Sequence, residues 1–230
     1  MSIFLMKRCG QSQRPIGLKE NDRITLTPVP TGVRKTGSQY QSSTIRLCMK
    51  KNQALNMEII ESQRILLRPL TLDDGEFILQ LLNTDGFIKY IGDRNVRTIE
   101  QARGYLLNGP LKSYETNGFG LSLAELKTDR TPVGMCGLLK RDYLDHADIG
   151  FAFLPNHTGK GYAYEIVKEI ILFGLNELQM EKILAIVLPD NSSSVKLLEK
   201  LHFKYEENFI SPDTQEELAL YSVSKNNFGT

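Results

Sequence analysis

Two glycines, Gly159 and Gly161, mark a loop whose backbone could bind an anion. The surrounding residues 147–165 read ADIGFAFLPNHTGKGYAYE, an apolar run followed by the loop and then by a segment with helical spacing. Glycine adopts backbone angles that a β-carbon forbids and lets a ligand approach the main chain. The free amides and the positive dipole end of the following helix favour an anion there, most often a phosphate. The segment therefore predicts a strand, a loop of phosphate size and a helix start.

The better-known phosphate loops fit this segment incompletely. Tyr164 replaces the third glycine of the dinucleotide pattern G-x-G-x-x-G, and no Gly-Lys-Ser/Thr of a Walker A loop follows at the required spacing. A tight strand-to-helix turn without a ligand produces the same pair of glycines. The loop alone therefore leaves two interpretations open, a structural turn and an anion site.

Bulk composition is that of a soluble globular protein. Of 230 residues, 41% are hydrophobic and 24% are charged, as in ordinary globular domains. No apolar run approaches the ~20 residues that span a bilayer. The opening residues MSIFLMKRCG place a short apolar stretch before their charges, unlike a secretory signal. We therefore expect a cytoplasmic protein without a membrane partner.

The cysteines and histidines offer no metal site. Cys9, Cys48 and Cys136 are widely spaced and form no C-x-x-C pair, which argues against both a zinc site and a disulfide framework. The histidines show no ligand spacing with cysteine or with one another. We expect no metal.

Charge divides the chain near residue 57. Residues 1–56 carry ten Lys or Arg and two acidic side chains, a net charge of +8. Because the whole chain has 28 basic and 27 acidic residues, residues 57–230 carry a net charge of −7. The prediction is a basic, disordered extension over 1–56 and a folded domain over 57–230, with Met57 as a candidate natural start.

The basic extension has an alternative interpretation as an RNA- or ribosome-binding tail. It lacks interleaved aromatic residues and a recognisable nucleic-acid fold. We therefore expect no direct nucleic-acid partner.

Two capping patterns predict helices in the first half of the folded region. Each pairs a Thr with an acidic or amide side chain three residues later, an arrangement that satisfies free amides at a helix start. The patterns are Thr71-x-x-Asp74 and Thr98-x-x-Gln101. Asn108-Gly109-Pro110 interrupts or ends the second helix, because proline lacks the amide that a helix interior needs.

Short β-prone runs supply the strands. They are 65–67, 119–126, 133–139, 149–154, 183–188, 203–206 and 218–223. The run 183–188 is almost continuously apolar, which suits a central strand buried on both faces and parallel to the strand before the loop. The order predicts a mixed α/β sheet around one core, with a β-α-β crossover at the glycine loop.

Four segments together resemble the GCN5-related N-acetyltransferase (GNAT) superfamily, and within it the branch of ribosomal-protein N-terminal acetyltransferases. The segments are ILLRPLTLDD, ADIGFAFLP with NHTGKGYAYE, KILAIVLPDNSSSVKLLEKLHFKYE and LALYSV, and they span about Arg64 to Val223. The resemblance implies an α/β (α+β) fold with a mixed, mostly antiparallel sheet of about seven strands, about four helices and one parallel β-α-β crossover.

The resemblance places acetyl-CoA on the glycine loop. The superfamily signature Gln/Arg-x-x-Gly-x-Gly/Ala falls on residues 158–163, with Thr at the first position instead of Gln or Arg. Backbone amides of this loop would hold the pyrophosphate of acetyl-CoA, and a Thr should leave them in place. The residues concerned are Thr158, Gly159, Lys160, Gly161, Tyr162 and Ala163.

The resemblance places the rest of acetyl-CoA along the neighbouring strands. The pantetheine arm would pair with the strand at Phe153 and Leu154, where one backbone N–H would face the thioester oxygen as an oxyanion donor. Asn191 matches an asparagine that contacts the cofactor in the family. A helix N-cap explains Asn191 equally well, and the two roles are compatible.

Two catalytic candidates follow from the resemblance. Ser194 matches a serine near the sulfur, where it could protonate the leaving thiolate; otherwise it is an ordinary surface helix serine. Asp148 stands where the branch often carries Glu and is the first candidate for the general base, directly or through water. The alternative for Asp148 is a polar residue at a strand start.

Other positions bear on proton transfer. Glu206 and Glu207 are weaker candidates for the base, and His157 beside the loop could titrate usefully. Many members use a tyrosine as the general acid where this chain has Leu198, which cannot donate a proton. His202 stands where the family usually has Gly, and we expect this change to alter a helix exit and not the chemistry.

These patterns predict an acetyl-CoA-dependent N-acetyltransferase in which a primary amine attacks the thioester directly. The amine would belong to a protein N-terminus or a small molecule, bound near Tyr90, Tyr105 and Phe209. No Cys lies in a nucleophile-like motif, which argues against a covalent enzyme intermediate. A non-catalytic acyl-CoA-binding or sensing module is the alternative. We expect a monomer or a homodimer.

Overall fold

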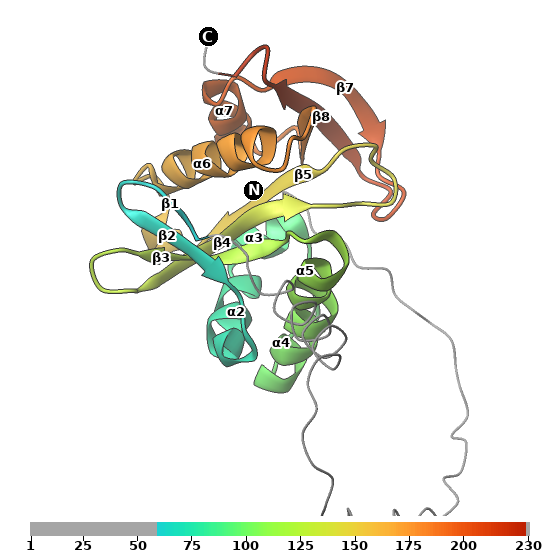
Figure 1. The fold of residues 1–230 in the computed structure, drawn as a ribbon. Helices are drawn as coiled ribbons and strands as arrows, with labels where there is room; N and C mark the ends of the chain where they lie inside the picture. The colour runs from blue at the N-terminus through green and yellow to red at the C-terminus, as the bar shows by residue number, and fades with distance from the viewer. Residues whose placement is uncertain (1–58, 229–230) are drawn as a thin grey trace, which may run out of the picture. The chain divides into compact units, whose positions relative to one another are not determined.

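A computed structural model describes residues 59–228, which form an eight-stranded sheet with helices on both faces (Figure 1). The strand order is β1-β2-β3-β4-β5-β6-β8-β7. The strands are β1 (Ile60–Glu61), β2 (Ile65–Pro69), β3 (Leu121–Leu126), β4 (Pro132–Leu139), β5 (Asp148–Phe153), β6 (Lys182–Val187), β7 (Lys204–Ile210) and β8 (Glu217–Ser224). The predicted boundary at residue 57 and the basic segment 1–56 lie outside the described residues.

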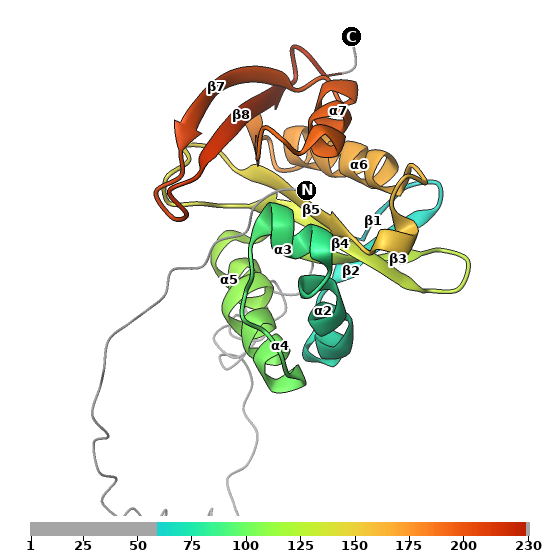
Figure 2. The same cartoon turned by 180° about the vertical axis from the view of Figure 1, so that it is seen from behind.

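Helices cover the sheet in two layers, as Figures 1 and 2 show from opposite sides. One layer is α6 (Tyr162–Asn176) with α7 (Ser192–Lys200), and the other is α2 (Gly75–Leu82), α3 (Asp85–Ile91), α4 (Ile99–Leu106) and α5 (Lys112–Asn117). Each layer buries its own apolar cluster against the sheet. The cluster on the α6 side includes Ile166 and Ile170, and the cluster on the opposite side includes Ile78 and Phe87.

The sheet confirms the predicted fold class. Its strands are antiparallel except β5 and β6, which run parallel and are joined by α6. β6 is buried from Ile183 to Val187, as expected for a strand covered on both faces. The described residues contain eight strands where the sequence suggested about seven, because two-residue β1 pairs with β2 and is too short to leave a pattern.

Both predicted capping patterns are present. At the first helix, the Thr71 amide donates to Asp74 Oδ2 at 2.7 Å. At α4, the Gln101 amide donates to Thr98 Oγ1 at 3.2 Å, and the Thr98 amide donates to Gln101 Oε1 at 3.1 Å. These local exchanges begin the two helices where the sequence predicted.

Pro110 interrupts the second helix without ending the helical path. α4 continues through a π-helical segment, Leu107–Leu111, directly into α5. Proline removes one amide and its ring clashes with the carbonyl four residues earlier. A widened turn accommodates both effects, and Asn108 Nδ2 donates to the Gly104 carbonyl at 2.9 Å.

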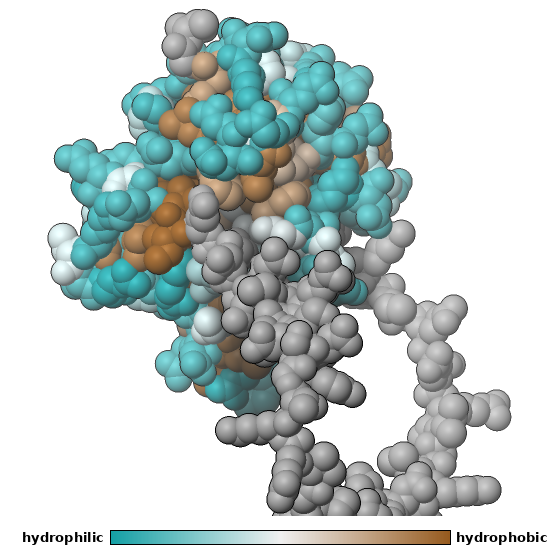
Figure 3. Space-filling model, viewed as in Figure 1, coloured by the Kyte–Doolittle hydropathy of each residue, from teal (hydrophilic) through white to brown (hydrophobic). Residues whose placement is uncertain are grey.

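The surface view in Figure 3 is mainly hydrophilic, with apolar side chains gathered beside β1 and β2 below α6. A pocket of about 260 Å³ lies in this region, lined by residues that include Ile60, Leu67, Ile170 and Phe173. No helix within residues 59–228 is long and apolar enough to cross a membrane.

His202 forms the exit from α7 in a left-handed conformation, with φ of 63°. Its amide donates to the Glu199 carbonyl and the Phe203 amide donates to the Leu198 carbonyl, both at 3.0 Å. This is the hydrogen-bond pattern of a helix end that usually carries Gly. The position therefore serves the helix exit, in agreement with the expectation from the sequence.

We expect His202→Gly to stabilise the protein by about 0.5–1 kcal/mol, because relief of left-handed strain exceeds the added entropy of the unfolded chain. Urea denaturation measures this difference. His202→Ala is the control, since it removes the imidazole but keeps a β-carbon. Equal stabilisation by Ala would contradict the backbone explanation.

Candidate functional site

Strands β5 and β6 diverge toward their carboxyl ends. Their single registered pair is Asp148 with Leu184, where the Leu184 amide donates to the Ala147 carbonyl at 2.9 Å. Farther along β5, the Leu154 amide donates to the Val133 carbonyl of the β4 side at 2.9 Å. Because the backbone amides of successive strand residues point to opposite neighbouring strands, the Phe153 amide points toward β6. The opening can therefore take an extended ligand that hydrogen-bonds to β5.

Leu154 has less backbone capacity for such a ligand than Phe153. Its amide is used by Val133, and its carbonyl accepts from the His157 amide at 2.9 Å. Of the two predicted pantetheine contacts, Phe153 thus has a backbone amide that faces β6, whereas half-buried Leu154 has its side chain.

The glycine loop connects β5 to α6 through a short 3₁₀ turn, Pro155–His157. Gly159 has φ of 72° and Gly161 has φ of 83°, so both use the left-handed region that disfavours a β-carbon. Gly161 is the N-cap of α6, and no side chain caps this helix start. As in any α-helix, the first-turn amides of this 15-residue helix have no acceptor within the helix, and no side chain among the described residues takes that place. They can bind an anion.

Residues 158–161 of the loop are exposed, as an anion site requires. The Thr158 amide donates to the Pro155 carbonyl at 3.2 Å, and Thr158 Oγ1 donates to the same oxygen at 2.8 Å. Thr158 therefore closes the turn before the glycines. The amides that remain for an anion are those that follow it.

A hollow adjoins the beginning of the loop. It measures about 660 Å³ and lies between α2 and the turn after β5. Phe77 and Gln80 line it from α2, and Leu154, Asn156 and His157 line it from the other side. The loop thus borders open space large enough for part of a nucleotide-sized ligand.

Asn191 is the N-cap of α7, in the connection that follows β6. Its Oδ1 accepts from the Ser194 amide at 3.3 Å, which is the N-cap bond. The side chain is only 3% exposed, and Nδ2 has no hydrogen-bond partner among the described residues. A buried amide donor without a partner is costly. It can be satisfied by a ligand in the opening between β5 and β6.

Ser194 is buried and lies in the first turn of α7, with 5% of its surface exposed. The alternative interpretation as an ordinary surface serine is therefore wrong. Its position near the N-terminus of α7 places the hydroxyl where the helix dipole favours negative charge.

Asp148 lies at the closed end of the opening and is fully buried. Arg141 Nε donates to Asp148 Oδ1 at 2.9 Å, and Arg141 Nη2 donates to Oδ2 at 3.0 Å. Burial raises the pKa of the Asp148 carboxyl, and the Arg141 guanidinium opposes this rise. Any proton transfer to Asp148 must therefore use the remaining lone pairs of a carboxylate already bound to arginine.

The other proton-transfer candidates occupy different environments. Glu206 is exposed and its Oε1 accepts from Lys182 Nζ at 2.8 Å; Glu207 is exposed on the same strand. His157 is half-buried near the loop, and its Nδ1 has no partner among residues 59–228. Leu198 is buried in the core of the α6 side, so it takes no part in proton transfer.

Several charged and aromatic groups meet on the side of the opening opposite α6. Arg94 interacts electrostatically with Tyr105, with Arg141 and with Asp213 in the β7–β8 turn. Burial lowers the pKa of Arg94 and raises the pKa of Tyr105. The sequence pointed to Tyr105 but not to Arg94 or Arg141. Asp213, with which Arg94 interacts, is far from it in the chain.

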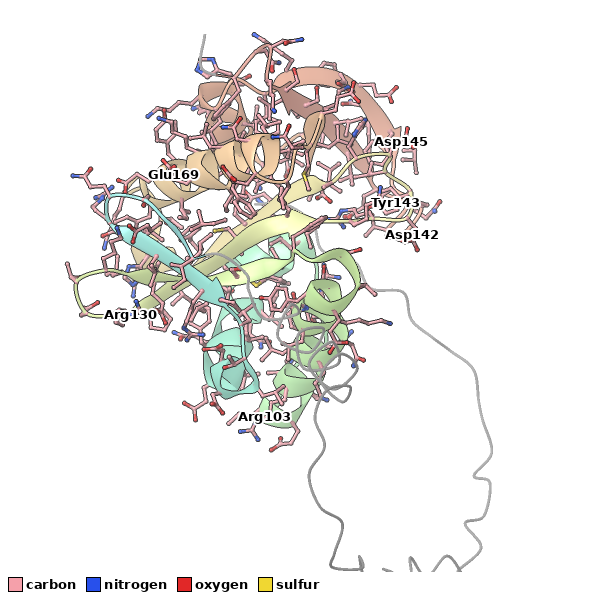
Figure 4. The ribbon with its side chains drawn as sticks, in the orientation of Figure 1. Arg103, Arg130, Asp142, Tyr143, Asp145 and Glu169 are labelled. Carbon is pink, nitrogen blue, oxygen red and sulfur yellow. The ribbon has the colours of Figure 1, made fainter. Side chains whose placement is uncertain are left out.

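Tyr143 connects this group to the closing hairpin. Its ring lies 6.3 Å from that of Phe209, and Figure 4 shows it in the β4–β5 loop near the β7–β8 hairpin. Burial raises the pKa of Tyr143, and Arg141 opposes the rise. Two predicted acceptor residues, Tyr105 and Phe209, are thus linked through Arg141 and Tyr143. At the third predicted acceptor residue, Tyr90, the Lys89 Nζ lies 4.7 Å from the ring centre.

The arrangement combines a loop with free helix amides, a divergent pair of strands and a group of buried polar side chains. Among the described residues, no cluster of His, Cys, Asp or Glu could hold a metal ion. The chemistry available within this region is hydrogen bonding, electrostatic stabilisation and proton transfer.

Comparison with known proteins identifies the same architecture. Residues 64–204 match the family model described as the acetyltransferase (GNAT) domain. The uncharacterized N-acetyltransferase p20 of Bacillus licheniformis is 32% identical over 153 residues, which cover 65% of this chain and 84% of that protein.

Solved structures share the fold. A GNAT-family acetyltransferase from Bacillus anthracis superposes with a TM-score of 0.63 at 24% identity, covering 74% of this chain and 99% of the other. RimL, a ribosomal L7/L12 α-N-protein acetyltransferase solved with coenzyme A, has a TM-score of 0.63 at 15% identity and covers 73% of this chain and 98% of its own.

We expect Arg141→Met to destabilise the protein by about 3–5 kcal/mol at neutral pH, because it leaves the buried Asp148 carboxylate without its cation. The folded-state pKa of Asp148 would rise further. The loss should therefore be largest above that raised pKa and shrink as the pH falls toward ~4, the value for an unfolded Asp.

Urea denaturation across this pH range measures the effect. The double variant Arg141→Met/Asp148→Leu should recover most of the stability, since no buried charge remains. Arg97→Met is the matched control, because it breaks an exposed pair with Asp93 and should change stability little. A pH-independent loss in Arg141→Met would contradict the assignment.

Proposed function

Because this chain belongs to the acetyltransferase (GNAT) family and is an N-acetyltransferase, we propose that it transfers the acetyl group of acetyl-CoA directly to a primary amine. One observation carries the proposal. The amides of the α6 start and the unpartnered Nδ2 of Asn191 both stand at the carboxyl ends of β5 and β6, where these strands separate.

Acetyl-CoA fits this opening by its chemistry. The loop amides from Gly159 to Ala163 would hold the pyrophosphate, with Thr158 closing the turn before them. The Phe153 amide would pair with the pantetheine arm, which replaces the missing β6 neighbour. Asn191 Nδ2 would donate to the same ligand. The two helix N-termini add favourable dipoles for its negative groups.

The reaction forms one bond and breaks one. The amine nitrogen attacks the thioester carbon, the new C–N bond forms, the C–S bond breaks, and the nitrogen loses a proton while CoA leaves as a thiol. A backbone amide of β5 would stabilise the negative oxygen of the transition state. We assign Ser194 as the proton donor to the leaving sulfur, because its hydroxyl is buried at the start of α7.

Asp148 remains our candidate for the proton acceptor, acting through a water. Its two oxygens are held by Arg141, so the amine itself has no direct approach along those lone pairs. Burial raises the pKa of this carboxyl, which brings it closer to neutral pH, where a general base works best.

The acceptor amine would enter from the side of Arg94, Tyr105, Tyr143 and the β7–β8 turn. This polar and aromatic lining suits an amine that carries further polar groups, as a peptide N-terminus does. RimL, which acts on a ribosomal protein N-terminus by its name, shares the fold. We therefore propose a protein N-terminus or a small-molecule amine as the acceptor.

An acceptor screen tests the proposed function. The full chain is incubated with labelled acetyl-CoA and a panel of peptides, amino acids and polyamines, and thiol release is measured with product mass. Transfer to nitrogen supports the proposal. Tight CoA binding without turnover on any acceptor would favour a non-catalytic acyl-CoA-binding module instead.

We expect Gly161→Asp to abolish CoA binding in isothermal titration calorimetry, because it adds a negative charge to the loop that would hold the phosphates. Gly161→Asn is the matched control: it has similar volume and similar tolerance of the left-handed region but no charge. It should bind CoA far better than the Asp variant. Unchanged affinity of Gly161→Asp would refute the placement of the pyrophosphate.

A second variant separates the two roles of Asn191. Asn191→Ser keeps an oxygen that can cap α7 but removes the amide donor, so stability should stay nearly constant while CoA affinity falls by roughly tenfold or more. Thermal unfolding without ligand and calorimetric titration with CoA measure the two effects. Loss of stability with full CoA affinity would assign Asn191 to the helix cap alone.

A further inference from the structure

Arg64, in the turn between β1 and β2, reaches across to the glycine loop. Its Nη2 donates to the Lys160 carbonyl at 2.8 Å, and its guanidinium carbon lies 4.6 Å from the centre of the Tyr162 ring. The contact joins residues 96 positions apart in the chain. One side chain therefore touches the loop on both sides of Gly161.

The same guanidinium forms an ion pair with Glu165 in the first turn of α6. Arg64 Nε donates to Glu165 Oε1 at 2.8 Å, and Nη2 contacts the same oxygen. The Arg64 backbone amide and the Ser62 hydroxyl each donate to Glu165 Oε2 at 3.3 Å. Glu165 is thereby held at both oxygens by the β1–β2 turn.

The bond to Lys160 orients the anion-binding backbone. In a trans peptide, the carbonyl of one residue and the amide of the next point in opposite directions. With the Lys160 carbonyl turned to Arg64, the Gly161 amide must point to the other face of the loop. A β-carbon at position 161 would lie 3.3 Å from Arg64 Nη2, so glycine also allows this close approach.

The ion pair also changes the charge of the loop. Glu165 lies in the first turn of α6, where its carboxylate would repel a bound phosphate. Arg64 places a cation against that carboxylate, and hydrogen bonding to Glu165 raises the pKa of Arg64, which keeps it charged. The amides at the start of α6 can therefore bind an anion, because the Glu165 carboxylate beside them is paired with a cation.

We propose that Arg64 is a positioning residue of the pyrophosphate loop: it turns the Gly161 amide toward the ligand and neutralises Glu165. This inference rests on the proposed binding of acetyl-CoA. Arg64 does not need to touch the ligand. Its effect on affinity should therefore appear through the loop, and only for ligands that carry the pyrophosphate.

Arg64→Gln tests this role by two binding measurements on the full chain. The Kd for CoA, from calorimetry, should rise roughly tenfold, since charge-assisted hydrogen bonds that hold the loop are lost. The Kd for pantetheine, which lacks the pyrophosphate, should stay unchanged in an NMR titration suited to weak binding. Arg64→Lys should recover part of the CoA affinity because it restores the charge.

Arg97→Gln is the matched control, because Arg97 forms a comparable exposed ion pair with Asp93 away from the loop. It should leave both Kd values unchanged. In Arg64→Gln/Glu165→Gln, removal of the repelling carboxylate should restore part of the CoA affinity. A double variant as weak as Arg64→Gln would overturn the neutralisation of Glu165.

The outcomes separate this inference from the proposed function. A wild-type chain that binds CoA, with Arg64→Gln binding it equally well, overturns the inference alone. Equal weakening of CoA and pantetheine by Arg64→Gln also overturns it, because that result describes a general structural role. A wild-type chain that binds neither ligand overturns the proposed function, and with it the role of Arg64.

Discussion

The divergence of β5 from β6 is the constraint on which the site depends. The strands meet at Asp148 and Leu184, and the Phe153 amide farther along faces a neighbour that has moved away. Buried backbone groups need hydrogen-bond partners, so a ligand that pairs with β5 would satisfy the backbone amide that β6 does not reach. The parallel crossover through α6 also brings a helix start, with its free amides, to the same end of both strands.

Electrostatics at this opening depends on distant parts of the chain. The N-termini of α6 and α7 both favour negative charge. The Glu165 carboxylate would weaken that preference at α6, and Arg64 in the turn between β1 and β2 forms an ion pair with it. At the closed end of the groove, Arg141 compensates the buried Asp148 carboxylate. Glu165 and Asp148 are therefore each held by an arginine from a neighbouring strand connection.

The ion pair between Arg141 and Asp148 explains why catalytic roles are harder to assign than binding roles. A phosphate loop uses backbone amides, so the proposed binding does not depend on a Gln or Arg at the position of Thr158. Proton transfer needs a particular side chain with access and a suitable pKa. Asp148 has the raised pKa but little access, and Ser194 is buried at a helix start. The proposed acceptor side, around Arg94 and Tyr143, combines charged and aromatic side chains.

The sequence by itself determined the features that act over a few residues: the glycine loop, the helix starts at Thr71 and Thr98, the Asn191 cap and the succession of strands and helices along the chain. Local hydrogen bonds and apolar spacing carry that information. Only the tertiary structure decided that Pro110 widens a helix without ending it, and that Arg64 meets Glu165 across 101 positions. Such contacts depend on strand register and helix packing. These bring together residues that are distant in the chain, so the local sequence around one residue does not indicate the other.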